Sequence, residues 1–169
     1  MRNTRGETTI GLPDGLAARI LEESPDAILI CDVEGVVRYW NQGAERVFGF
    51  PREDVLDQSL NIIIPERFRD RHWAGWNAAM STGVTRYNDG ELLGVPALHK
   101  DGRQISIEFS IQLVNDAGGH PQWVVACVRD VTARYIRETA LRAALQAQYR
   151  EGESTEPGLP GKRQCETRL

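Results

Sequence analysis

The chain has 169 residues, of which 20 are basic and 24 acidic, so its formal charge is −4. This length fits one domain with flanking segments, and the acidic balance argues against direct nucleic-acid binding, which needs a clustered cationic face. No run of about 18 apolar residues is present, so we expect no membrane span. The three cysteines, Cys31, Cys127 and Cys165, are scattered without metal-binding spacing. Such cysteines suit a reducing cytoplasm.

The first half of the chain predicts one strand hairpin among short helices. Residues 1–15 are polar and glycine-containing and are predicted to form a flexible arm, and Asp14 is a plausible helix cap. Asn41 can cap a further helix that ends at Gly49. The predicted elements, in order, are a helix over 12–23, strands over 27–31 and 36–40, and helices over 42–48, 51–56 and 66–80.

The second half predicts three strands and a terminal helix. In the middle strand, the apolar residues Ile105, Ile107, Phe109, Ile111 and Leu113 alternate with polar ones, which is typical of a half-buried antiparallel strand. The predicted elements are strands over 91–99, 105–113 and 123–129 and a helix over 132–150, with Pro96 indicating an edge strand or a bulge. Two strands, several helices and three strands in this order favour an α+β fold, an antiparallel sheet with helices on one face.

Four short blocks resemble the PAS domain family and occur in the family's order. They are residues 27–48 with Trp40-Asn41-Gln42-Gly43-Ala44, the segment Gly49-Phe50-Pro51 onward to Leu56, the turn Lys100-Asp101-Gly102, and Arg129-Asp130-Val131-Thr132. The resemblance covers residues 16–133. It implies a five-stranded antiparallel sheet with helices on one face, together with flanking helices at the N- and C-terminal sides.

PAS domains sense ligands or light, or pair with other proteins, and pass the event to an effector. By this resemblance, Asp130 and Thr132 form the junction at which the signal leaves the domain. Residues 134–150 become a signalling or dimerisation helix, and residues 151–169 a disordered tail. Too few residues follow Thr132 for a kinase or cyclase, so we expect a cytoplasmic module whose effector acts in trans. The expected partner is a second copy of the chain or a signalling protein such as a kinase.

The resemblance also implies two candidate cofactors, flavin and haem. Flavin-binding relatives with photochemistry need a reactive cysteine in the helical region, whereas residues 41–80 contain none. Cys31 and Cys127 fall in predicted strands, where we expect buried, inert thiols. The sequence therefore argues against flavin photochemistry.

Haem is the second cofactor. The helix around His72 is similar to that of the oxygen-sensing haem PAS domains of rhizobial nitrogen-fixation kinases, and His72 lies where these place their iron ligand. Arg86 could pair with a propionate, and Trp76 could line the same pocket. Residues 88–93 depart from that family, because they lack its arginine that contacts bound oxygen and carry an apparent one-residue insertion.

Three functions follow, none of them enzymatic. The first is a PAS module that binds a small ligand or a partner protein, the second a haem-based gas or redox sensor with His72 as axial ligand, and the third a ligand-free dimerisation adaptor. Trp73 and Trp76 can share a helix face and belong either to a ligand pocket or to the core. No Ser/His/Asp set, close carboxylate pair or phosphate-binding glycine loop is visible, so we expect no catalytic site.

Overall fold

A computed structural model describes residues 12–85 and 92–153 of the chain, and the side chains up to residue 150. The predicted arm before residue 12, the predicted tail beyond residue 153 and Arg86 lie outside these residues. The helices are α1 (Leu16–Glu23), α2 (Gln42–Phe48), α3 (Arg52–Val55), the 3-10 turn η1 (Leu60–Ile62), α4 (Glu66–Thr82) and α5 (Thr132–Glu153). The strands are β1 (Ala27–Cys31), β2 (Val37–Trp40), β3 (Leu93–Leu98), β4 (Gln104–Asn115) and β5 (Pro121–Asp130).

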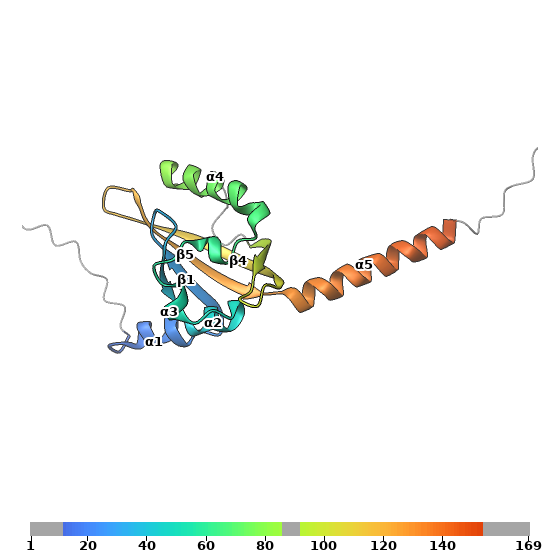
Figure 1. Cartoon of the computed structure of the whole chain (residues 1–169), viewed down its shortest axis with the longest axis horizontal. Coiled ribbons are helices and arrows are strands. Elements are labelled where there is room, and N and C mark those ends of the chain that lie inside the picture. The colour runs from blue at the N-terminus through green and yellow to red at the C-terminus, as the bar shows by residue number, and fades with distance from the viewer. Residues whose placement is uncertain (1–11, 86–91, 154–169) are drawn as a thin grey trace, which may run out of the picture. The chain divides into compact units, whose positions relative to one another are not determined.

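The five strands form one antiparallel sheet in the order β2-β1-β5-β4-β3, which confirms the predicted α+β fold. The chain between β2 and β3 forms α2, α3, η1 and α4 in succession (Figure 1). Strand β3 lies at the edge and carries Pro96, as its proline predicts, because an edge strand needs fewer backbone donors. None of the helices in the described part of the chain has the length and apolarity that a bilayer crossing requires.

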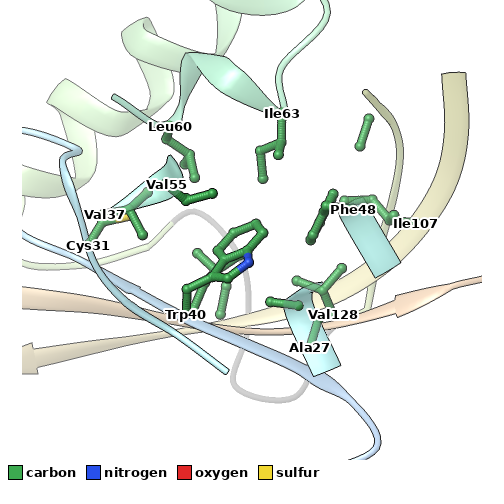
Figure 2. Close-up of a cluster of buried hydrophobic side chains, with 14 of the residues drawn as sticks. Ala27, Cys31, Val37, Trp40, Phe48, Val55, Leu60, Ile63, Ile107 and Val128 are labelled. Carbon is green, nitrogen blue, oxygen red and sulfur yellow. The ribbon is translucent and has the colours of Figure 1, made fainter. Parts of the chain in front are cut away.

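The core lies between the sheet and the segment from α2 to η1. Trp40 is fully buried at its centre, with Leu60 and Ile63 on one side and Ala27 and Val128 on the other (Figure 2). The Trp40 indole also donates to the carbonyl of Phe50 at 3.2 Å, so its polar atom is satisfied. As predicted for neighbours on a strand, Tyr39 points to the opposite face of the sheet. It reaches Glu22 there.

Strand β4 confirms the predicted alternation of apolar and polar residues, but its inner face is not buried along its whole length. Ile105 and Ile107 are 2% and 5% exposed, and both belong to the core. Phe109, Ile111 and Leu113 face the same side, opposite the buried Val128, Ala126 and Val124 of β5, yet they are only half-buried. The inner face of the sheet is therefore buried at the Ile105 end of β4 and partly exposed at the Leu113 end.

Helix α1 begins later than the sequence predicts. Gly15 precedes it in the left-handed region, at φ 78°, and the amide of Leu16 donates to the carbonyl of Pro13 at 3.1 Å. This turn takes the place of a side-chain cap, so the predicted capping by Asp14 is wrong. Glycine adopts such a φ without the steric cost of a Cβ.

Helix α5 forms a second unit, which follows the compact unit that ends at Thr132. It runs to Glu153, three residues into the segment predicted as a tail. Several large apolar side chains of α5 are exposed, namely Tyr135, Ile136, Leu141, Leu145 and Tyr149. A helix of this kind is marginal in water unless it packs against another surface.

Candidate functional site

Helix α4 is held to the rest of the domain by long side chains rather than by close packing. It ends at Gly83, whose φ of 70° stops the helix, and none of its residues is fully buried. Near its start, the guanidinium of Arg69 donates to the carbonyls of Ile64 and Asn61, both at 3.2 Å. These bonds attach the helix to the chain that leads into it.

Two tryptophans attach α4 to the turn between β1 and β2. The indole of Trp73 donates to Asn61 Oδ1 at 2.9 Å, and its ring lies so close to Gly35 that a Cβ there would be 2.4 Å from it. The indole of Trp76 donates to the carbonyl of Val33 at 2.8 Å. Both side chains pack partly buried against the core, so they anchor the helix and also flank His72.

Of the predicted ligand residues that the structure describes, His72 is the one with an unused polar atom. Its ring centroid lies 4.8 Å from that of Trp73 and 5.8 Å from that of Trp76. Its Nδ1 is buried and has no hydrogen-bond partner among the described residues. Burial lowers the pKa of His72 below its ordinary value, so the imidazole is neutral near pH 7. A buried polar atom without a partner costs about 1–3 kcal/mol, which a ligand that bonds to it would recover.

The sheet next to α4 offers apolar surface to a ligand. On β3, Val95 is 39% exposed, and Ile111 and Leu113 of β4 are half-buried. The same two β4 residues line a groove of about 520 Å³ that begins at Gly83, the end of α4. The rest of its lining comes from Val84, Thr85, Ser110, Gln112, Asn115, Val125 and Cys127. The groove therefore combines apolar side chains with the polar residues Thr85, Ser110, Gln112 and Asn115.

Asp130 and Thr132 form a second cluster, at the end of β5. The Asp130 carboxylate accepts from the amide of Thr132 at 2.8 Å, and the Thr132 hydroxyl oxygen accepts from the amide of Ser106 at 2.9 Å. The carbonyl of Ser106 in turn accepts from the amide of Val131 at 2.8 Å. We call these bonds the Ser106–Thr132 latch, because they tie the first residue of α5 to β4.

Sequence reasoning missed how α1 is attached. Asn41, predicted only as a helix cap, also donates to the carbonyls of Leu21 and Asp26, at 2.9 and 3.0 Å. The Glu22 carboxylate accepts from the guanidinium of Arg52 and from the Tyr39 hydroxyl. The residues that bind Asn41 and Glu22 lie far from them in the sequence, so no spacing rule could have predicted these contacts.

The two cysteines in the described part of the chain differ in their exposure to solvent. Cys31 is buried as expected, and burial raises the pKa of its thiol to about 12, which makes it inert. Cys127 is exposed, so its predicted burial is wrong, because it lies on the sheet face opposite the core. Burial of part of the side chain still raises the pKa of the Cys127 thiol. Within residues 12–85 and 92–153, no three His, Cys, Asp or Glu side chains gather as a metal site would require.

Comparisons with known proteins agree on one family. A family model described as "PAS fold" matches residues 21–136. The chain is similar to Sensor protein FixL of Bradyrhizobium diazoefficiens, with 29% identity over 130 residues, or 73% of this chain and 24% of FixL. It is also similar to Oxygen sensor protein DosP of Escherichia coli K12, with 24% identity over 134 residues, or 79% of this chain and 16% of DosP. The chain thus spans a quarter or less of these two relatives.

A solved structure shows the same fold. The PAS domain of a Colwellia psychrerythraea protein aligns with a TM-score of 0.60 at 21% identity, over 69% of this chain and 95% of that one. At this identity the likeness concerns the fold alone. Both curated relatives are named as sensor proteins.

Proposed function

Because the chain belongs to the PAS fold family, we propose that it is a sensory module that binds a small ligand beside α4 and relays its occupancy through α5 to an effector in signal transduction. The observation that carries the proposal is the buried Nδ1 of His72, which has no hydrogen-bond partner among the described residues and whose ring lies beside those of Trp73 and Trp76. Apolar side chains on the inner face of β3 and β4 are only half-buried. A ligand with an apolar body and one hydrogen-bonding group would satisfy both features.

Strand β4 supplies the relay. Its residues Ile111 and Leu113 line the groove that begins at the end of α4, and its residue Ser106 belongs to the latch with Thr132. Strand β4 pairs with β5 from Ile107 to Asn115 and with β3 from Gln104 to Phe109. We propose that a shift of β4 at the groove alters the hydrogen bonds at Ser106. Strand β4 therefore joins the groove to the Ser106–Thr132 latch, and it is proposed to transmit the occupancy of the groove to α5.

The output requires a partner for α5. Leu141 and Leu145 are 63% and 47% exposed, and a single helix with such a face gains stability from a second chain. We propose a homodimer or a signalling protein such as a kinase as this partner. The module is proposed to bind rather than to catalyse, and its free thiols favour a cytoplasmic location.

Native mass spectrometry of the full chain, purified without denaturation, tests the ligand. We expect a bound small molecule whose retention falls in the variant Trp76→Ala but not in Asn77→Ala, an exposed substitution on the same helix. A bare polypeptide mass after expression under several growth conditions would contradict ligand binding. That outcome, combined with a dimer, would instead support the adaptor without a ligand.

A haem-based sensor is the second candidate. A neutral imidazole on a helix beside an apolar region suits an axial iron ligand, and the similarity to DosP, named an oxygen sensor, favours the same interpretation. His72 would hold the group, which would supply gas binding; Arg86 lies outside the described residues. A Soret band that appears on haemin addition and is lost in His72→Ala would support this candidate. A colourless protein would exclude it.

A further inference from the structure

The end of β5 is attached unequally to its two neighbouring strands. Its pairing with β1 ends at Val128. Its pairing with β4 continues for two more residues, through Arg129 and Asp130, and the Ser106–Thr132 latch prolongs this attachment to the first residue of α5. The backbone of the junction between β5 and α5 is therefore bonded to β4 and, within the described residues, not to β1.

The side chain of Arg129 makes the attachment on the β1 side. Its guanidinium donates to both carboxylate oxygens of Asp26, at 2.7, 2.9 and 3.0 Å, and Asp26 directly precedes β1. The hydrogen bonds from Arg129 lower the pKa of Asp26 below its ordinary value, so this carboxylate is charged near pH 7. A guanidinium that bonds to both oxygens of a carboxylate fixes the geometry of the pair as well as attracting it.

The backbone of Asp26 is itself held by α2. Its carbonyl oxygen accepts from Nδ2 of the buried Asn41 at 3.0 Å, and a Cβ on Gly43 would lie only 2.1 Å from the same oxygen. A displacement of Asp26 would therefore break a hydrogen bond of a buried side chain or press the carbonyl against α2. Arg129 is thus bound to a point that is fixed independently of β4.

We propose that Arg129 is a positioning residue of the relay: by holding the end of β5 to Asp26, it makes a shift of β4 act on the Ser106–Thr132 latch. Without this bond, the end of β5 and the first residue of α5 follow β4, and the latch between them stays intact. With it, one side of the junction is fixed while the other moves, so the shift is concentrated at the latch. The inference rests on the proposed function, because it names a residue on which the relay from β4 to α5 depends.

Glu108 also faces Arg129, because the two residues lie opposite each other in the pairing of β4 with β5. The hydrogen bonds to Asp26 are the largest cause that raises the pKa of Arg129, and the charge of Glu108 adds a smaller contribution. A bond to Glu108 would attach Arg129 to the strand that moves and would leave the junction free to follow it. The three hydrogen bonds to Asp26 select the fixed side instead.

The exchange rate of the Ser106 amide, measured by NMR on the full chain, tests this role. Ile111→Trp is the probe of occupancy, and it is introduced into the wild type, into Arg129→Gln and into Asp26→Asn. It should change the rate by about fivefold or more in the wild type, but by less than about twofold in either chain without the ion pair. Arg19→Gln, which removes an exposed ion pair of α1, should leave the full response.

The reversed ion pair provides a rescue. Asp26→Arg combined with Arg129→Asp should restore most of the response to Ile111→Trp that each single change removes, because the attachment is formed again with opposite charges. Urea unfolding of each chain verifies that it is folded. A purely stabilising role of the pair would lower the free energy of unfolding without changing the response.

Three results would overturn the inference. A full response in Arg129→Gln, or a response that is lost in Glu108→Gln but kept in Asp26→Asn, would contradict the positioning role and leave the proposed relay intact. A wild-type chain without any response to Ile111→Trp would contradict the relay itself, and this inference with it.

Discussion

Replacing Asn41 with alanine should destabilise the domain more than any other single polar substitution we consider. Asn41 is fully buried. Its Oδ1 accepts from the amides of Ile28 and Ala44, both at 2.8 Å, and its Nδ2 donates to the carbonyls of Leu21 and Asp26. One side chain thus joins α1, β1 and α2.

The expected magnitude follows from the bonds that Asn41→Ala would break. Loss of an N-terminal cap costs about 0.5–2 kcal/mol. The amide of Ile28, buried and left without an acceptor, costs about 1–3 kcal/mol more. The free energy of unfolding should therefore fall by about 2–4 kcal/mol, allowing for the non-additivity of neighbouring bonds.

Urea unfolding followed by tryptophan fluorescence measures this change, because Trp40 lies at the centre of the core. At an m-value of about 1–3 kcal/mol/M, the midpoint should shift by at least roughly 0.7 M. Asn77→Ala, an exposed change on α4, should stay within about 0.5 kcal/mol of wild type. A loss below about 0.5 kcal/mol for Asn41→Ala would refute the assigned network.

Three further changes follow from the structure. Thr132→Val removes the acceptor for the amide of Ser106 at 2.9 Å, so that amide should exchange hydrogen faster and stability should fall by about 1–2 kcal/mol. Gly43→Ala places a Cβ 2.1 Å from the carbonyl oxygen of Asp26, and this clash should cost about 1–3 kcal/mol or more in urea unfolding. Burial lowers the pKa of His72, so the unfolded chain binds that proton more tightly and stability should fall as the pH drops below about 6.5. His72→Gln should remove part of the loss between pH 7.5 and 5.5.

Each of these changes has a matched control at a position with free space. Thr139→Val on the exposed surface of α5 should leave the Ser106 amide unchanged. Gly94→Ala adds a Cβ that meets no atom within 4 Å, so it should be nearly neutral. Asn77→Ala, an exposed change on the same helix as His72, should leave the loss of stability between pH 7.5 and 5.5 unchanged. Equal effects of a variant and its control would contradict the corresponding argument.

The fold could be predicted because local rules determine most of it. The period-two pattern from Ile105 to Leu113 identified β4, and Asn41 and Gly49 marked the ends of α2 through their capping roles. Pro96 placed β3 at the edge, because a proline removes a backbone donor. Each of these features depends on residues that are close in the sequence.

The site was only partly predictable, because its contacts are not local. The sequence singled out His72 and Trp76, but not that their neighbour Trp73 bonds to Asn61 and covers Gly35. The half-burial of Ile111 could not be read from a pattern in which it looks the same as the buried Ile107. Ile107 belongs to the core cluster with Phe48 and Ile63, whereas Ile111 does not.

The most direct test of the relay is to fill the open end of β4 and to measure the amide exchange of Ser106 by NMR. Ile111→Trp introduces a large apolar group on the inner face, as a ligand would, whereas Val114→Trp places it on the opposite face and outside the lining of the groove. If β4 carries occupancy to α5, only Ile111→Trp should change the exchange rate of the Ser106 amide, by about fivefold or more. An unchanged rate in a folded Ile111→Trp variant, or equal changes in both variants, would contradict the coupling.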